Sequence, residues 1–388
     1  MRDGLLILDV GSVLTPFDKF SPGRVVVLGD RIEAAGTISD VRIPASATRL
    51  DLPDLILVPG FIEPHVHGCG GFDVMDATPD SMNIISKTLA KYGTTSFLPT
   101  TVSAPFDVLE AALKRLADFI HAEPAGATPL GIHLEGPFLN VQKRGTHQSG
   151  NVCKPDPVLL LKWMQLSGGH LKLLTMAPEL DGAALTADRA RGANVVVAMG
   201  HSDATFSESL AAVNAGTHYA VHTFNAMRQF SHRDPGIVGA VLSDDRVFAE
   251  VIADGVHVAP EVVRIFAKAK GATRIILATD ATSATGMPDG QYALGSGKVQ
   301  VQGGVCRDAE GRLAGSTLTQ DRALRNLLEW TGLRLDDALL GLTANPAEAL
   351  AIDGRGRIEP GAVADLTLLD KNLEVVRTYV SGKLVFAR

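Results

Sequence analysis

Four histidines and one glutamate have the types and positions needed to hold a divalent metal ion. His65 and His67 lie in VPGFIEPHVHG, and in an extended strand a separation of two places both imidazoles on the same face. Glu135 follows in HLEGP, and the other two histidines are His201 in GHSDAT and His222 in VHTFNAM. Neutral imidazoles and a carboxylate with one open position suit catalytic zinc or a similar metal. Each histidine alone is better explained as a core or rim residue, so the prediction rests on the whole set.

Asp280 is the candidate for proton transfer at the same site. It ends the apolar run RIILATDA, where an ordinary role would be a helix N-cap or a turn residue. A carboxylate partly buried beside a metal can take a proton from activated water and return it to a leaving group. We therefore predict that Asp280 is the general base and then the general acid.

These residues fall at the ends of apolar runs that are typical of buried parallel strands. The runs are GFIEPHVH, TSFLPTT, LGIHLEG, LKLLTMAP, NVVVAMGH, YAVHTFNA, FAEVIAD and RIILATDA, and stretches of helical spacing separate them. Other polar residues at their ends are Thr100, Thr101, His133, Glu179 and Asp254. Eight strands alternating with helices predict an α/β fold, a (β/α)8 TIM barrel, whose active site lies at the C-terminal ends of the strands. The candidate residues would therefore share one rim.

The two ends of the chain have a different pattern from the middle. Residues 1–57 contain short strand-like segments separated by Gly, Pro and Asp, and residues 346–388 repeat this pattern. We predict that the two ends pair into one small β-sandwich domain and that 58–345 form the barrel. GDRIEAAG indicates a hairpin and not a nucleotide-binding loop, because the chain has no GxGxxG or Walker pattern.

Composition narrows the class of protein. The 388 residues are 46% hydrophobic and 20% charged, which fits a globular protein with one large and one smaller domain. A net charge of -7 provides no basic field, so we expect no nucleic acid and no membrane as partner. The N-terminal segment shows no signal-peptide pattern. Three cysteines without a CxxC pair fit a reducing compartment, so we expect a cytoplasmic protein: Cys69, Cys153 and Cys306.

Motifs in order along nearly the whole chain carry a specific resemblance. They are PGFIEPHVHG, GTTSFLPTT, HLEGPFLN followed by KRGTHQ, LTMAPE, MGHSDAT, HTFNAM followed by RDPG, ADGVHV, ATDA, LAGSTLT, NPAEALAI and GRIEPGAVADLTLLD. Through them the chain resembles the amidohydrolase superfamily and, within it, the family of N-acetylglucosamine-6-phosphate deacetylases. The resemblance implies hydrolysis of N-acetyl-D-glucosamine 6-phosphate to D-glucosamine 6-phosphate and acetate, in amino-sugar catabolism and cell-wall recycling.

The resemblance also implies a role for each matching position. Glu135, His201 and His222 would bind the catalytic metal, and metal-activated hydroxide would attack the acetyl carbonyl while Asp280 moves the proton. The positions implied to contact the substrate are Thr146, His147, Asn225, Ala226, Arg233, His257, Leu313, Ala314 and Gly315. Of these, His147 would help to stabilise the oxyanion. Arg233 and His257 would bind the phosphate, although from the residues alone Arg233 is an ordinary solvated loop charge.

The number of metal ions depends on the His-x-His pair. Some members of the resembling family lack both histidines and use one metal, so His65 and His67 add a second set of ligands here. Glu135 has two oxygens and could bridge the two ions. We predict a binuclear site, or the capacity for one, with zinc first and iron, manganese or cobalt as alternatives. The resemblance further implies a homodimer with the phosphate site near the subunit interface.

Alternative functions stay open at this point. The substrate could be N-acetylgalactosamine 6-phosphate, or the protein could be another amidohydrolase acting on a small N-acyl compound. Arg233 and His257 are the discriminating residues for a phosphorylated substrate, because a neutral or amino-acid substrate would not need them. A non-catalytic barrel that scaffolds partners is a third reading, but it would be expected to have lost residues of the ring, which is complete here.

Overall fold

The computed structural model describes residues 5–43 and 48–388. Eight parallel strands form the barrel, and each overlaps one of the eight predicted runs: β6 (Phe61–Val66), β9 (Thr94–Thr101), β11 (Ile132–Glu135), β12 (Leu171–Met176), β13 (Val196–Met199), β14 (Tyr219–Ala220), β15 (Phe248–Val251) and β16 (Ile275–Leu277). The barrel closes through a parallel bridge between Val66 and Ala281. Residues 1–4, the start of the segment predicted not to be a signal peptide, lie outside the described ranges.

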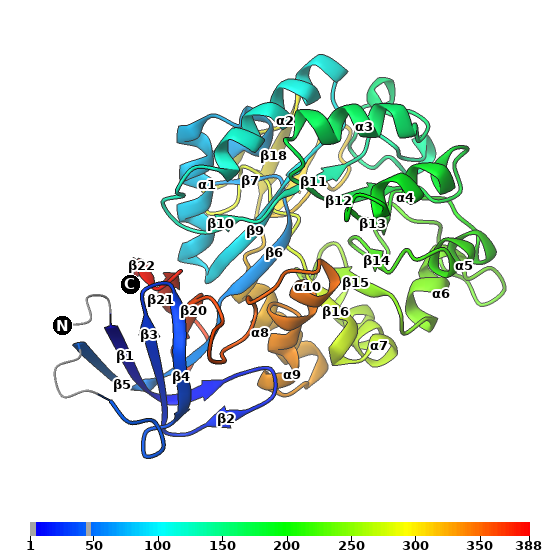
Figure 1. Cartoon of the computed structure of the whole chain (residues 1–388). Coiled ribbons are helices and arrows are strands. Elements are labelled where there is room, and N and C mark those ends of the chain that lie inside the picture. Colours follow the sequence, from blue (N-terminus) through cyan, green and yellow to red (C-terminus); the bar gives the residue numbers. More distant parts are fainter. Residues whose placement is uncertain (1–4, 44–47) are drawn as a thin grey trace.

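Helices surround the barrel strands (Figure 1). They are α1 (Pro79–Lys91), α2 (Phe106–Ile120), α3 (Pro157–Leu166), α4 (Ala183–Arg191), α5 (Phe206–Asn214), α6 (Gly236–Ser243), α7 (Pro260–Lys270), α8 (Gln320–Thr331), α9 (Leu335–Leu340) and α10 (Ala344–Ala349). Their starts follow from local chemistry: Thr205 caps α5 and exchanges hydrogen bonds with Glu208, and Pro79 occupies the first turn of α1. Within the described ranges, no helix is both long and apolar enough to cross a membrane.

Shorter elements connect the barrel units. The 3-10 turns are η1 (Val74–Asp76), η2 (Val141–Lys143), η3 (Ser149–Asn151) and η4 (Ala272–Arg274), and the short strands are β7 (Gly68–Cys69), β8 (Phe72–Asp73) and β10 (Thr128–Pro129). A three-stranded antiparallel sheet follows the last barrel strand: β17 (Gly290–Leu294), β18 (Gly297–Gln302) and β19 (Val305–Arg307). Our sequence reading did not predict this sheet, which brings Leu294 to the mouth of the barrel.

The two ends of the chain pair as predicted. The strands are β1 (Leu5–Leu14), β2 (Lys19–Phe20), β3 (Gly23–Leu28), β4 (Arg31–Thr37), β5 (Thr48–Pro59), β20 (Leu366–Leu369), β21 (Val375–Val380) and β22 (Lys383–Ala387). Antiparallel pairing of β5 with β20 joins the N-terminal strands to the C-terminal ones, and Figure 1 shows them together beside the barrel.

This small domain fits the predicted sandwich, and its eight strands belong to one hydrogen-bonded sheet. Leu8, Val25 and Leu368 are among the residues that form its core. The GDRIEAAG segment makes the predicted hairpin between β3 and β4. Strand β5 ends at Pro59 and β6 begins at Phe61, so only Gly60 separates a strand of the small domain from a strand of the barrel. The domain boundaries at 57/58 and 345/346 remain predictions.

Candidate active site

The C-terminal rim of the barrel encloses a cavity of about 170 Å³. Its lining contains most of the predicted site residues: His67, Val102, Glu135, Gly145, Thr146, His147, His201, His222, Asn225, Ala226, His257, Asp280, Leu294, Leu313 and Gly315. His65 lies beneath this lining and is fully buried. Most of the residues predicted to bind metal and substrate therefore share one chamber.

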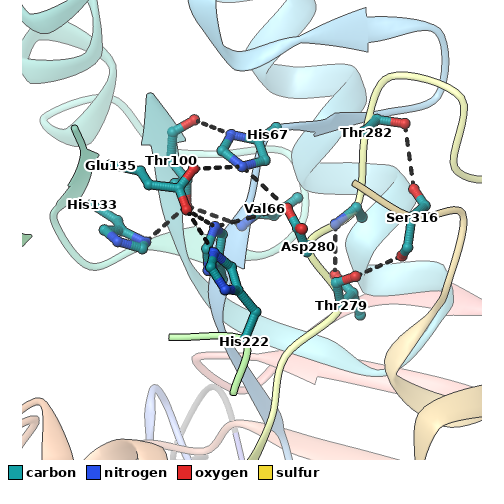
Figure 2. A network of polar contacts seen from close by, with 12 residues as sticks. Val66, His67, Thr100, His133, Glu135, His222, Thr279, Asp280, Thr282 and Ser316 are labelled. Carbon is teal, nitrogen blue, oxygen red and sulfur yellow. Dashed lines mark hydrogen bonds and ion pairs between the residues drawn. The ribbon is translucent and has the colours of Figure 1, made fainter. Parts of the chain in front are cut away.

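Glu135, at the end of β11, is the centre of the group. Its Oε1 lies 3.1 Å from His201 Nε2, 3.1 Å from His222 Nε2 and 3.3 Å from His65 Nε2. Figure 2 shows His222 and Glu135 directed toward one another. Three ring nitrogens around one oxygen exceed the two lone pairs of that oxygen. A cation among them would satisfy all four side chains.

The other oxygen of Glu135 faces a second group. Its Oε2 lies 3.2 Å from His67 Nε2 and 3.3 Å from His147 Nε2. His67 Nε2 also lies 3.1 Å from Asp280 Oδ1, a contact that Figure 2 displays. Three sets of side chains have ligand atoms close enough to share one ion: His65, Glu135 and His222; His65, His67 and Asp280; and Glu135, His147 and His201.

Outer hydrogen bonds set the ring form of three histidines. His67 Nδ1 lies 3.1 Å from the carbonyl of Thr100, and His201 Nδ1 lies 2.9 Å from the carbonyl of Lys143. A carbonyl only accepts, so each Nδ1 carries the proton and the neutral ring turns the Nε2 lone pair toward Glu135. His65 has the same arrangement with a carboxylate on Nδ1, and its buried Nε2 has no hydrogen-bond partner among the described residues. These observations fit a metal centre.

His147 has the opposite ring form. Its Nδ1 accepts the backbone N–H of Ser103 at 3.1 Å and lies 2.9 Å from the Ser103 hydroxyl. The proton of the neutral ring is therefore on Nε2, which faces the cavity. Burial lowers the pKa of His147 to about 4, although Glu135 acts in the other direction, so the ring is neutral at pH 7. His147 is thus built as a hydrogen-bond donor and not as a metal ligand.

Backbone strain marks the turns that follow the strands. His201, His222 and Asp280 have positive φ angles of 48°, 28° and 50°, a region that non-glycine residues rarely adopt. Such residues cost of order 1–3 kcal/mol each and gather at functional sites. The backbone N–H of Asp280 donates to the carbonyl of His65 at 3.1 Å, which ties the last barrel strand to the first.

His257 and Arg233 differ in where the structure places them. His257 lines the cavity, and its Nδ1 lies 2.7 Å from Asp254 Oδ2. Burial alone would lower the pKa of His257, but the hydrogen bond to Asp254 raises it above the usual value. Arg233 is exposed on the loop before α6 and is not part of the cavity lining. Ala314 is buried between Leu313 and Gly315, which both line it.

Other predicted rim residues support the site from outside. Glu179 accepts hydrogen bonds from Ser202 Oγ and from the backbone N–H of Asp203, so it holds the turn after His201. His133 is buried behind the centre, where its Nε2 lies 2.7 Å from the Thr175 hydroxyl. Neither residue lines the cavity.

Two buried carboxyl groups were missed by the sequence reading. Glu63, on β6, accepts the N–H groups of His65 and Thr279 at 3.1 and 3.3 Å, and burial raises its pKa to about 8. Glu250, on β15, contacts His65 and His222. Each is the single acid of a largely apolar strand, FIEPHV or FAEV, which was the one signal available.

A (β/α)8 barrel with histidine and carboxylate ligands gathered on its C-terminal rim defines a class of metal-binding barrel enzymes. The chain belongs to the amidohydrolase family, whose model matches residues 56–385.

Individual relatives cover nearly the whole chain. It is 40% identical to an N-acetylgalactosamine-6-phosphate deacetylase of Escherichia coli O157:H7, over 90% of this chain and 93% of that one. It is also 40% identical to an N-acetylglucosamine-6-phosphate deacetylase of Vibrio furnissii, over 92% and 90%. Among solved structures, a mutant N-acetyl-D-glucosamine-6-phosphate deacetylase of Mycobacterium smegmatis in complex with N-acetyl-D-glucosamine-6-phosphate has a TM-score of 0.93 and 35% identity, covering 99% and 100%.

Proposed function

We propose that the protein is a metal-dependent deacetylase that hydrolyses N-acetyl-D-glucosamine 6-phosphate to D-glucosamine 6-phosphate and acetate, in amino-sugar catabolism and cell-wall recycling. The observation that carries this proposal is the chamber in which Glu135, its converging imidazoles, Asp280 and His257 meet. The deacetylases to which the chain is similar over most of its length support the substrate class.

Glu135, His201 and His222 would hold the catalytic ion, and His65 and His67 would complete a second set through the same carboxylate. We propose one or two ions per chain, zinc first, with iron, manganese or cobalt as alternatives. When bound, a divalent ion supplies Lewis acidity toward the amide carbonyl and makes water more acidic.

Protons would compete with the metal at His67. Burial would lower the pKa of His67, but hydrogen bonds to Asp280 and Glu135 raise it to about 9. The Nε2 that faces these carboxylates is the atom that a proton and an ion would both use. We therefore expect metal affinity to fall as the pH falls.

Asp280 would transfer the proton, and His147 would stabilise the negative charge that develops on the carbonyl oxygen. Burial acts to raise the pKa of Asp280, yet the hydrogen bond from His67 and the charge of His65 hold it well below its usual range. Asp280 is therefore ionised at neutral pH and can accept a proton from the attacking water, then pass it to the departing amine. The Nε2–H of His147 points into the chamber, where it can donate to the carbonyl oxygen as negative charge develops.

The substrate test compares acetate release from the two N-acetylated hexosamine 6-phosphates and from unphosphorylated N-acetylglucosamine. We expect the glucosamine epimer to give the highest kcat/KM. The galactosamine epimer is the second candidate, because the E. coli relative carries that name at 40% identity. Faster hydrolysis of that epimer would assign the protein to the second function. No acetate from any of the three would leave an amidohydrolase for another N-acyl compound or a non-catalytic scaffold.

Arg233 is proposed to reach the phosphate across a homodimer interface, because the cavity of its own chain does not include it. Arg233→Ala should lower kcat/KM for the phosphorylated sugar by about 10–100-fold, the worth of a hydrogen bond to a charged group, and leave the unphosphorylated sugar unaffected. Arg246→Ala is a matched control, since this exposed arginine pairs with Asp244 and lies outside the cavity lining. An unchanged kcat/KM in Arg233→Ala would refute the phosphate assignment.

Cytoplasmic location stays part of the proposal. The three cysteines are all free, and Cys69 and Cys306 are buried. This state agrees with a reducing compartment.

A further inference from the structure

Glu250 is a buried carboxylate that the proposed reaction does not use. It lies on β15 with 0% of its surface exposed, beneath the rim where the substrate would bind. No lysine or arginine among the described residues forms an ion pair with it, and its one ion-pair partner is His65. Burying a carboxylate that is not paired with lysine or arginine costs free energy, so its presence calls for a functional explanation.

Its side-chain hydrogen bonds come from two parts of the barrel, β14 with the turn that follows it and β6. Glu250 Oε1 accepts the hydroxyl of Tyr219 at 2.9 Å, from β14. Its Oε2 accepts the backbone N–H of His222 at 3.0 Å, and His65 Nδ1, on β6, lies 3.0 Å from the same oxygen. One oxygen atom therefore contacts both His222, which we propose as a ligand of the catalytic ion, and His65, which we propose as a ligand of the second ion.

Each contact has a consequence for ligand geometry. Glu250 Oε2 accepts the N–H of His222, and as an acceptor for His65 it keeps the proton of His65 on Nδ1 and leaves the Nε2 lone pair directed at Glu135. The hydrogen bond from the backbone N–H of His222 to Glu250 secures a residue whose φ of 28° is strained. The ring of this residue also faces Glu135. Without Glu250, the His65 ring could move its proton to Nε2 or rotate.

We propose that Glu250 is a positioning residue that selects the ligand form of His65 and aligns it with His222, so that binding of a second metal ion depends on Glu250. This inference rests on the proposed metal centre. It assigns to Glu250 a role in metal stoichiometry and not in the transfer of protons to the substrate.

The test is metal content per chain, measured after dialysis against buffered zinc at a free concentration that fills both sites of the wild type. Glu250→Met removes the acceptor and should weaken the second site by about 10–100-fold, so the count should fall from two to one. Glu250→Gln should retain two ions. Its amide oxygen can accept from His65 and His222 while its amide nitrogen donates to the Tyr219 oxygen. Tyr219→Phe, which removes only the tyrosine hydrogen bond, should also retain two.

Thermal unfolding shows whether each variant is folded, and Glu250→Asp replaces Glu250→Met if the latter is not. The shorter side chain should also lower the count, since its carboxylate cannot reach all three donors. Two ions at wild-type affinity in folded Glu250→Met, or in Glu250→Asp where it stands in, would overturn the inference. One ion in the wild type would overturn it too, and acetate release by that protein would leave the proposed function standing. Two ions in the wild type without acetate release would leave the inference standing and would contradict the proposed function.

Discussion

Asp280→Asn should lower kcat for amide hydrolysis by about 10³-fold, within the range of 10²–10⁴ for loss of a general acid–base group, with little change in KM. The asparagine amide has the size of the carboxylate but cannot take a proton from water or deliver one to the amine. The backbone should remain in place, because asparagine tolerates the positive φ of 50° at this position better than most residues. Steady-state acetate release measures the effect.

The matched control for this variant is Asp289→Asn. Asp289 accepts backbone hydrogen bonds from Gly303 and Gly304 on an exposed turn, so the same chemical change there should leave kcat unaltered. Metal content must also be equal in both proteins. If Asp280→Asn with a full complement of metal kept kcat within tenfold of the wild type, Asp280 would not be the base.

Glu135→Gln should nearly abolish both metal binding and activity. Glu135 is 2% exposed and contacts five imidazoles through its two oxygens, so it is the one anion shared by both ligand sets. Glutamine keeps the volume and removes the charge that balances the ions. We expect kcat/KM to fall by about 10³-fold or more, because a Lewis acid contributes several kcal/mol to the barrier.

Elemental analysis of the dialysed Glu135→Gln protein separates this account from a simple loss of fold. The prediction is a folded protein with less than one ion per chain. Glu179→Gln is the comparison, since Glu179 is on the same rim but bonds Ser202 and Asn140 and does not line the cavity. Retention of the wild-type number of ions by Glu135→Gln would contradict the assignment of this carboxylate as the shared ligand.

The barrel could be predicted from the sequence because its strands are buried on both faces. Strand β16 (Ile275–Leu277), which is apolar and buried at every residue, leaves a continuous apolar signature. Two helices gave weaker patterns: α4 is rich in alanine and arginine, and α6, Gly236–Ser243, has no polar face. The hairpin strand β18 did have a readable alternation, with Val299 and Val301 buried between exposed neighbours, and this period-2 signal was overlooked.

The types of site residue were predictable, but their relations in space were not. His147 is a donor because Ser103, 44 positions away, gives its N–H to the ring, and no local pattern encodes that contact. Motif matching placed Arg233 at the phosphate without indicating which copy of the chain presents it. Glu250 carries no motif, and its importance emerges only when β6 and β15 meet under the rim.

The central claim is that this metal centre hydrolyses the acetamide of an amino-sugar phosphate. It is tested most directly by titrating chelator-treated protein with zinc while measuring acetate released from N-acetyl-D-glucosamine 6-phosphate. Iron, manganese and cobalt would serve as parallel titrants. We predict negligible release without metal, a rise in proportion to the ion bound, and stoichiometric formation of free amino-sugar phosphate. Fully loaded, folded protein that releases no acetate with any of the four metals would contradict the claim.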